Sequence, residues 1–328
     1  MSLRGYILLL VLLVSAFGLA LFAGTGGLGP AELVAALSGK GGLEAQILRE
    51  LRLPRALLGL AIGAGLGASG AVLQGFFRNP LADPGVVGVS ASAGLGAVLA
   101  LYFGLAGLSL FAVPVAAITM AALGVGLLLV LAGPRAAATT LILAGVAVAA
   151  TATALTALIM NLAPNPWALA EIAYWLMGSL NDASWSEAGF ALPLIGAGFS
   201  LLLLTRGGLD ALSLGEETAR SLGVDLARLR LGVVAGTALA VGGGVAVAGA
   251  IGFVGLVVPH FLRPFVQYRA GALVLPSALA GGALLSLADT ATRLLSGPGM
   301  PLYLGVLTAL IGAPFFLWLV RANQTVAP

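Results

Sequence analysis

Long apolar stretches separated by short polar or proline-containing segments run through the whole chain. Each stretch is about as long as the roughly 20 residues that a helix needs to cross a bilayer. The pattern therefore predicts an all-α integral membrane protein, with residues 1–328 forming one transmembrane domain of about ten helices. The expected spans lie near residues 5–24, 54–77, 91–107, 110–132, 138–160, 189–205, 231–251, 253–267, 271–291 and 303–320.

The region 231–267 is the hardest to divide, because it is too long for one crossing and short for two. A continuous helix of this length would be roughly 55 Å long at 1.5 Å per residue. Arg228 and Arg230 precede the region, and Arg263 and Arg269 follow it. Since both pairs belong on the cytoplasmic side, the number of crossings must be even, and the sequence predicts two.

The composition excludes several classes of protein. Hydrophobic residues make up 60% of the chain and charged residues 8%, against about 25% charge in soluble domains. There is no cysteine and a single histidine, His260, so disulfides and thiolate metal sites are excluded. A net charge of +3 gives no reason to expect a nucleic-acid partner. The stretch from Met1 to Ala23 could pass for a signal peptide, but the spans that follow favour a retained helix.

Arginine is distributed unevenly between the two expected faces of the membrane. With the N-terminus inside, ten arginines fall on the cytoplasmic side and five basic residues on the outer side, which follows the positive-inside rule and makes both termini cytoplasmic. Four arginines are exceptions near the outer surface: Arg49, Arg52, Arg55 and Arg293. They either dock another protein, or anchor lipid headgroups and pair locally with Glu50 and Asp289.

Ten spans also invite an internal repeat. If the unit has five spans, the second copy must be inverted relative to the first, as in many transporters. Residues 63–85 and 242–265 share a glycine-rich helix that runs into a turn containing proline and arginine. We therefore expect an inverted five-helix pseudo-repeat.

Residues 207–230 form the one long polar segment on the expected cytoplasmic side and hold over a quarter of the charged residues. Ser213 and Glu216 have the spacing of a capping box. Glu216 and Arg220 can pair at i,i+4, and Gly223 can end the helix. A separately capped helix outside the membrane suits a groove on another protein, and a plain linker helix is the alternative.

The chain lacks an evident energy source. Lys40 lies in LSGKGG, without the upstream glycine and the following hydroxyl residue of a phosphate-binding loop. The middles of the expected spans hold none of the acids or bases that ion-coupled carriers use, and Asp289 can pair with Arg293 at i,i+4. We expect a transport protein that is not an enzyme and needs an external motor. The alternative hypotheses are an ion-coupled secondary transporter and an intramembrane enzyme.

Sequence signatures follow one another from the second expected span to the last. They are RLPR at 52–55, SGAVLQGFFRNPLADPGVVGVSASAG at 69–94, LILAGVAV at 141–148, YWLMGSL at 174–180, SLGEETARSLGV at 213–224, GFVGLVVPHFLR at 252–263 and GVLTALIGAPFFLWL at 305–319. In this order they resemble the permease subunit of type II ABC importers, which take up cobalamin, haem and iron-siderophores. The resemblance covers nearly all of the chain.

The resemblance implies partners and a place in the cell. Two permeases would form a homodimer around a central path in the bacterial inner membrane, with two cytoplasmic ABC ATPase subunits below and a periplasmic substrate-binding protein above. The chain itself would hold no metal and no cofactor, since ATP and Mg²⁺ would bind to the ATPase. The implied cargo is a metal chelate, either an iron-siderophore or haem, with cobalamin as the alternative.

The resemblance also implies roles for individual residues. The residues that match the docking site for the binding protein are Arg52, Arg55 and Arg293. Those that match the helix coupled to the ATPase are Ser213, Gly215, Glu216, Glu217, Arg220, Leu222 and Gly223. Those that match the cytoplasmic gate and the translocation path are Asn79, Pro80, Leu81, Thr139 and Thr140.

A few other residues need a separate interpretation. His260 lies in the family phrase VPHFLR, which favours packing or hydrogen bonding over haem ligation. Interfacial anchoring is the default for the aromatic residues expected at the outer ends of the spans, namely Trp167, Tyr174, Trp175 and Trp185. Before the last span, Met300 stands where relatives have glutamate, and two extra residues separate Pro301 from Gly305.

Overall fold

The computed structural model describes residues 1–23, 29–39, 42–133, 136–297 and 301–324, and most of them are helical. The long apolar helices are α1 (Leu3–Phe22), α4 (Leu53–Phe76), α6 (Ala112–Ala132), α7 (Ala138–Asn161), α9 (Trp185–Leu204), α12 (Leu226–Ala248), α14 (Ala270–Leu295) and α15 (Leu304–Gln324). Two shorter apolar helices are α5 (Val89–Tyr102) and α13 (Val254–Leu262). Each of the ten expected spans coincides with one of these helices, which confirms the predicted fold class.

Short helices connect the apolar ones or extend them. They are α2 (Pro30–Leu37), α3 (Leu43–Ile47), α8 (Pro166–Leu176), α10 (Arg206–Leu212) and α11 (Glu216–Ser221), with a π-helical turn η1 (Leu48–Arg52) and 3₁₀ turns η2 (Pro84–Val87), η3 (Leu105–Gly107) and η4 (Arg263–Val266). Among the described residues, seven helices are long and apolar enough to cross a membrane by themselves. Three further apolar stretches fall below that length: Val89–Tyr102, Val254–Val266 and, within α15, Leu304–Leu317.

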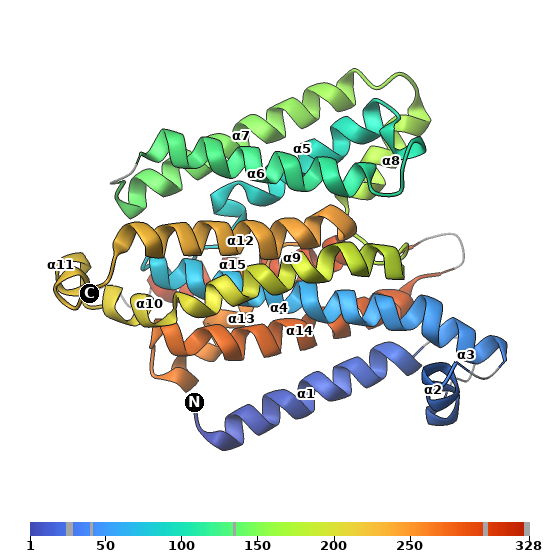
Figure 1. Cartoon of the computed structure of the whole chain (residues 1–328), viewed down its shortest axis with the longest axis horizontal. Helices are drawn as coiled ribbons and strands as arrows, with labels where there is room; N and C mark the ends of the chain where they lie inside the picture. Colours follow the sequence, from blue (N-terminus) through green and yellow to red (C-terminus); the bar gives the residue numbers. More distant parts are fainter. Residues whose placement is uncertain (24–28, 40–41, 134–135, 298–300, 325–328) are drawn as a thin grey trace.

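The helices lie side by side in a bundle whose centre is α4 (Figure 1). Helices α5 to α8 line one edge of the bundle, and α1 lies at the opposite edge beside α14. The start of α4 and the end of α14 mark one end of the bundle, here called the Arg55 end. Helix α11 and the end of α4 mark the other, here called the Arg220 end.

Glycine allows α4 to lie directly against α14. A Cβ atom added to Gly63 would collide with the carbonyl oxygen of Gly281, and one added to Gly67 would collide with that of Ser277. Such backbone contact is typical of membrane helices, which associate through close packing of small residues because lipid supplies no hydrophobic driving force. The glycine content of the chain predicts close helix contacts. It does not predict which glycines meet which residues, because the contacting residues lie far apart in the sequence.

The region 231–267 is divided into two helices, as predicted, at a non-helical break over residues 249–253. Phe253 in this break has a left-handed backbone, with φ of 67°. The carbonyl of Ala248 accepts a hydrogen bond of 2.8 Å from the amide of Ser179. Irregular backbone at membrane depth needs such partners within the protein, because lipid offers none. Helix α13 then begins beside the last third of α4, where Gly70 contacts Gly255, so it is shorter than a full crossing.

The order of helix lengths repeats along the chain. A long α4 of 24 residues, a short α5 of 14 and the long α6 and α7 precede a second series, in which α12 has 23 residues, α13 has 9, and α14 and α15 are long. Helix α12 runs antiparallel to α4, since Ile62 contacts Gly244 and Gly65 contacts Ala240. Both features agree with the expected inverted pseudo-repeat.

Candidate functional sites at the two ends of the bundle

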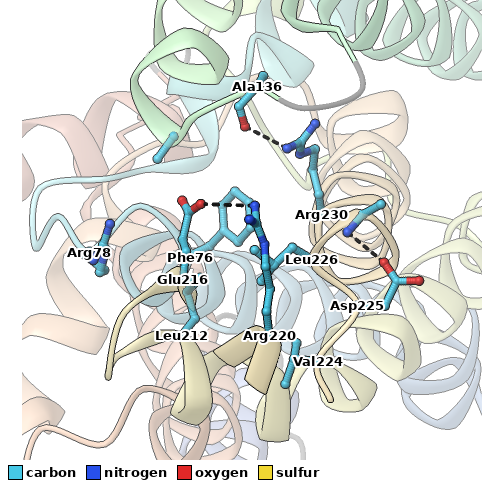
Figure 2. Close-up of a pocket in the computed structure, with 12 residues that line it drawn as sticks. Phe76, Arg78, Ala136, Leu212, Glu216, Arg220, Val224, Asp225, Leu226 and Arg230 are labelled. Carbon is cyan, nitrogen blue, oxygen red and sulfur yellow. Dashed lines mark hydrogen bonds and ion pairs between the residues drawn. The ribbon is translucent and has the colours of Figure 1, made fainter. Parts of the chain in front are cut away.

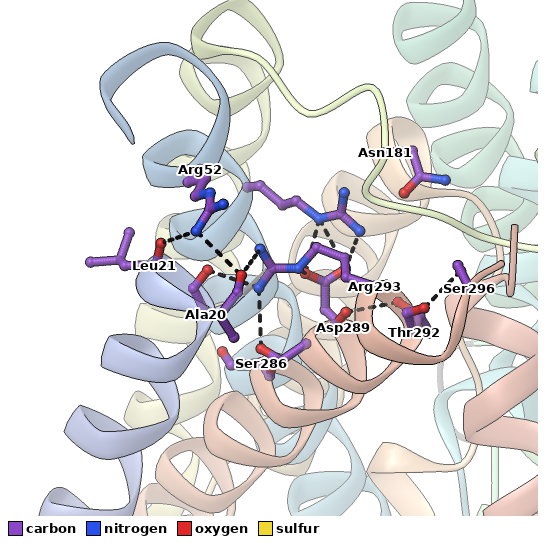
Figure 3. Close-up of polar contacts among 12 residues, drawn as sticks. Ala20, Leu21, Arg52, Asn181, Ser286, Asp289, Thr292, Arg293 and Ser296 are labelled. Carbon is purple, nitrogen blue, oxygen red and sulfur yellow. Dashed lines mark hydrogen bonds and ion pairs between the residues drawn. The ribbon is translucent and has the colours of Figure 1, made fainter. Parts of the chain in front are cut away.

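The three arginines expected to dock a partner converge at the Arg55 end. Arg52 ends η1, Arg55 lies in the first turn of α4, and Arg293 lies in the last turn of α14. They line a cavity of about 620 Å³ together with Asn181 and Ser296. Residues more than 200 positions apart in the sequence therefore form one positively charged surface (Figure 3).

A buried carboxylate organises this surface. Asp289, with a side chain 3% exposed, binds Arg55 through two oxygens, with Arg55 Nη2 2.8 Å from Oδ1 and Nε 2.9 Å from Oδ2. Arg293 Nε lies 3.6 Å from Asp289 Oδ2, which is the expected i,i+4 pair. Among the described residues, Glu50 forms an ion pair with its neighbour Arg49 at 2.7 Å and does not pair with the other three arginines. Local pairing through Asp289 and Glu50 is therefore confirmed, and it places Arg55 and Arg293 firmly.

Two of these arginines also serve the end of α1, a role that the sequence analysis missed. Arg52 Nη1 donates to the carbonyl oxygens of Leu21 at 2.9 Å and Ala23 at 3.2 Å. Arg293 Nη2 donates to the carbonyl oxygen of Ala20 at 2.8 Å (Figure 3). The last carbonyls of a helix lack partners within it and carry partial negative charge, so cations stabilise them. No local sequence signal marks this contact between distant residues.

The polar segment 207–230 contains three helical pieces, and one predicted cap is wrong. Ser213 does not form a capping box with Glu216, because its hydroxyl donates 2.6 Å to the carbonyl of Asp210 at the end of α10. The N-cap of α11 is Gly215, whose φ of 107° favours glycine. Helix α10 extends to Leu212 and so uses Ser213 at its own C-terminal end.

The other local predictions for this segment are confirmed. Glu216 and Arg220 form an i,i+4 pair at 3.8 Å. Gly223 has a φ of 83° and donates to the carbonyl of Arg220 at 2.9 Å, and Val224 donates to that of Ala219 at 3.0 Å. These two bonds form a Schellman motif, which ends the helix.

Exposed apolar side chains flank helix α11 and lie next to its charges. Ala219 is fully buried and fixes the helix to the bundle, whereas Leu214 and Leu222 are 64% and 61% exposed. Exposed leucines next to Glu217 and Arg220 suit contact with another protein. The leucines provide apolar area that the partner can bury, and the charges can fix the orientation of the partner.

The residues expected at the gate lie at the same end. Asn79, Pro80 and Leu81 form the turn after α4, where Asn79 Oδ1 accepts the amide of Leu81 at 2.9 Å. Thr139 and Thr140 are exposed in the first turn of α7.

A cavity of about 320 Å³ brings the gate and the polar segment together. It is lined by Arg78 and Ala138, the neighbours of Asn79 and Thr139, and by Glu216 and Arg220 (Figure 2). Helix α11, the end of α4 and the start of α7 therefore border one shared space.

The aromatic residues have two kinds of surroundings: some pack against one another, and others line a large cavity. The ring of His260 lies edge-on to Phe315 at 5.6 Å, and its Nδ1 is buried without a hydrogen bond among the described residues. The expected packing role is therefore the one observed. A cavity of about 700 Å³ contains Trp167, Tyr174 and Trp175 together with Tyr303, which stacks on Tyr174 at 5.7 Å.

Further residues complete the placement of the candidate sites. The indole of Trp185 donates to the carbonyl of Arg49 at 2.9 Å. In the part of the chain that the structure describes, no group of three or more His, Asp or Glu side chains is arranged to hold a metal ion. Met300 and Lys40 lie outside the described residues.

Comparison with known proteins gives consistent matches over nearly the full length. The model of the FecCD transport family matches residues 9–322. The chain is 42% identical to the cobalamin import system permease protein BtuC of Halobacterium salinarum, over 85% of this chain and 74% of that protein. It is 41% identical to the vitamin B12 import system permease protein BtuC of Vibrio cholerae, over 86% of this chain and 85% of that protein.

Relatives from Escherichia coli and a solved structure extend these matches. The vitamin B12 import system permease protein BtuC of Escherichia coli O157:H7 is 38% identical, over 97% of this chain and 95% of that protein. A solved structure described as an inward-facing conformation of a metal-chelate type ABC transporter superimposes with a TM-score of 0.84 at 33% identity, covering 97% of this chain and 98% of that one.

Proposed function

This chain belongs to the FecCD transport family as a multi-pass membrane permease of a type II ABC importer, and from that premise we propose that its cargo is cobalamin. The proposal rests on the relatives above, three of which are vitamin B12 or cobalamin import permeases by name. The expected iron-siderophore or haem cargo has less support than this alternative. His260, the one side chain that could suggest a haem ligand, packs against Phe315.

We further propose the assembly and orientation that the importer class requires. Two copies of this chain form a homodimer in the bacterial inner membrane, with the Arg220 end and both termini in the cytoplasm. The exposed face of α7, which includes Thr139 and Thr140 in its first turn, lines the path between the two copies. ATP hydrolysis occurs on two separate cytoplasmic subunits.

The arginine surface at the Arg55 end suits a periplasmic binding protein with acidic side chains. Arg55 and Arg293 are held by Asp289, so little side-chain freedom remains to be lost on docking. Exposed charge pairs each contribute only about 0–1 kcal/mol. Their main effect is therefore to steer the encounter and fix the orientation of the bound protein.

The Arg220 end suits transmission of force from the ATPase. We propose that closure of the ATPase dimer moves α11, and that the exposed Leu214 and Leu222 on either side of this helix contact the partner. The movement changes the cavity shared by Glu216, Arg220 and Arg78. It thereby opens or closes the turn at Asn79 and the start of α7 around the path.

Competition between cargoes tests the proposal. The permease is reconstituted in liposomes with its ATPase and binding protein, and ATP-dependent uptake of cobalamin, haem and a ferric siderophore is measured. We expect cobalamin to accumulate and the other two to leave its uptake unchanged. Uptake of an iron chelate without uptake of cobalamin would reject the cargo proposal and retain the transport class. The matched control uses vesicles loaded with ADP.

A further inference from the structure

A separate cavity of about 180 Å³ lies at the Arg220 end, between the end of α4, the turn after it and the start of α14. Its polar lining comes from Gln74, Arg78, Ser213, Arg263 and Tyr268. Two guanidinium groups therefore face one small space, and no carboxylate lines it.

The positive charge of this cavity is not balanced by the described part of the chain. The ion pairs of the described residues involve other arginines, and none includes Arg78 or Arg263. In Figure 2 the nearby carboxylate of Glu216 forms an ion pair with Arg220 at 3.8 Å. Two uncompensated cations in a half-enclosed space raise the local potential and attract an anion.

Arg263 is held in place by a neutral partner rather than by an acid. Gln74 is 2% exposed, and its amide nitrogen donates to the carbonyls of Gly255 at 3.2 Å and Leu256 at 3.4 Å. These bonds turn the amide oxygen toward Arg263, whose Nη2 donates to it. The guanidinium is thus oriented in advance while most of its five N–H donors remain available.

We propose that this cavity binds the phosphate group of an anionic phospholipid from the leaflet at the Arg220 end. Guanidinium groups bind phosphate oxygens through short, charge-assisted hydrogen bonds. Basic pockets between membrane helices are sites of the kind that anionic headgroups occupy.

The surroundings favour a lipid over a free anion. The cavity lies at the end of α4 and the start of α14, two helices that are long and apolar enough to cross a membrane. The segment that supplies Arg263 also exposes Phe261, Phe265 and Tyr268, at 56%, 67% and 70%. Tyrosine is enriched at the level of the headgroups, and the two exposed phenylalanines can pack along an acyl chain.

Native mass spectrometry of the full-length permease in neutral detergent tests the site. Phosphatidylglycerol or phosphatidylcholine is added to the wild type and to Arg78→Gln, Arg263→Lys and Arg228→Gln. The side chain of Arg78 makes no hydrogen bond or ion pair within the described residues, so we expect its replacement to leave the fold intact. Arg228→Gln is the matched control. It also removes one positive charge at the Arg220 end, but Arg228 does not line the cavity.

We expect the wild type and Arg228→Gln to retain phosphatidylglycerol over phosphatidylcholine, and Arg78→Gln to bind it at least about fivefold more weakly. Arg263→Lys keeps the charge but loses the fork that fits phosphate, so weaker binding is expected there too. Equal retention by all four proteins contradicts the proposal. Displacement of the lipid by millimolar inorganic phosphate rejects the lipid as the source. In a parallel measurement with the ATPase added, loss of the ATPase without loss of lipid in Arg78→Gln would assign Arg78 to the contact with the partner protein and reject the lipid site.

Discussion

Arg55 and Asp289 lie 234 residues apart in the chain and meet in a two-pronged ion pair, with Arg55 Nη2 2.8 Å from Asp289 Oδ1 and Nε 2.9 Å from Oδ2. The pair joins the first turn of α4 to the last two turns of α14. Arg293 shares the same carboxylate, so one acid fixes two of the three arginines at this end. The arginine surface is therefore part of the fold as well as a candidate docking site.

Removal of the buried carboxylate is expected to destabilise the protein. Asp289→Asn leaves Arg55 and Arg293 without their anion, and breaking a buried pair in this way costs about 3–5 kcal/mol. The melting temperature in detergent should fall clearly. The double variant Arg55→Met/Asp289→Leu should lose less than the two single losses combined, because it removes both members of the pair. A wild-type melting curve for Asp289→Asn would refute the structural role.

Close packing of α4 on α14 predicts a sharp contrast between two glycines. Gly67→Ala places a methyl group against the carbonyl of Ser277, and overpacking of this kind costs about 1–3 kcal/mol. Gly189 lies inside α9 with nothing within 4 Å of an added Cβ. Gly189→Ala should therefore stabilise the helix by up to about 1 kcal/mol. Thermal unfolding of both variants measures the difference, and equal shifts would contradict the packing.

Docking at the arginine surface should depend on charge and salt. Arg52→Gln removes a charge from the cavity wall, and we expect the association rate with the binding protein to fall by up to about fivefold, with a weaker salt dependence. Arg49→Gln is the matched control, since Arg49 pairs with Glu50 and does not line the cavity. Surface plasmon resonance at several salt concentrations measures both rates. Identical behaviour of the two variants would place the binding protein elsewhere.

Contact of α11 with the ATPase should depend on its exposed leucines. Leu222→Asp puts a charge at an apolar contact and leaves Ala219, the buried anchor, unchanged. We expect the ATPase to be lost from the purified complex while the permease keeps its melting temperature. Arg228→Gln, whose side chain is 89% exposed nearby, should retain the ATPase. Retention of the ATPase by Leu222→Asp would indicate a different contact.

Hydropathy predicts the number and rough position of the apolar helices because each must satisfy its backbone within itself in lipid. Local chemistry also predicts the C-terminal end of α11 and the ion pair within it, as the Gly223 motif and the Glu216–Arg220 pair show. The capping box at Ser213 is wrong because α10 extends further than the polar pattern indicates. The spacing of Ser213 and Glu216 alone does not reveal that competing helix end.

The tertiary contacts of the candidate sites could not be predicted from the sequence. Arg52 and Arg293 bind carbonyls at the end of α1, and nothing in the sequence of α1 marks that end for arginine. The shortness of α13 likewise depends on where Gly255 meets Gly70 in α4. The sequence predicts which residues have suitable chemistry, and the packing decides which of them meet.

We propose that this permease moves cargo only when partner proteins supply binding and energy. Uptake of labelled cobalamin into liposomes measures this directly, with the permease alone, with the ATPase added, and with both ATPase and binding protein. We expect accumulation against a gradient only in the complete system and only with ATP. Accumulation by the permease alone, driven by a proton or sodium gradient, would contradict it.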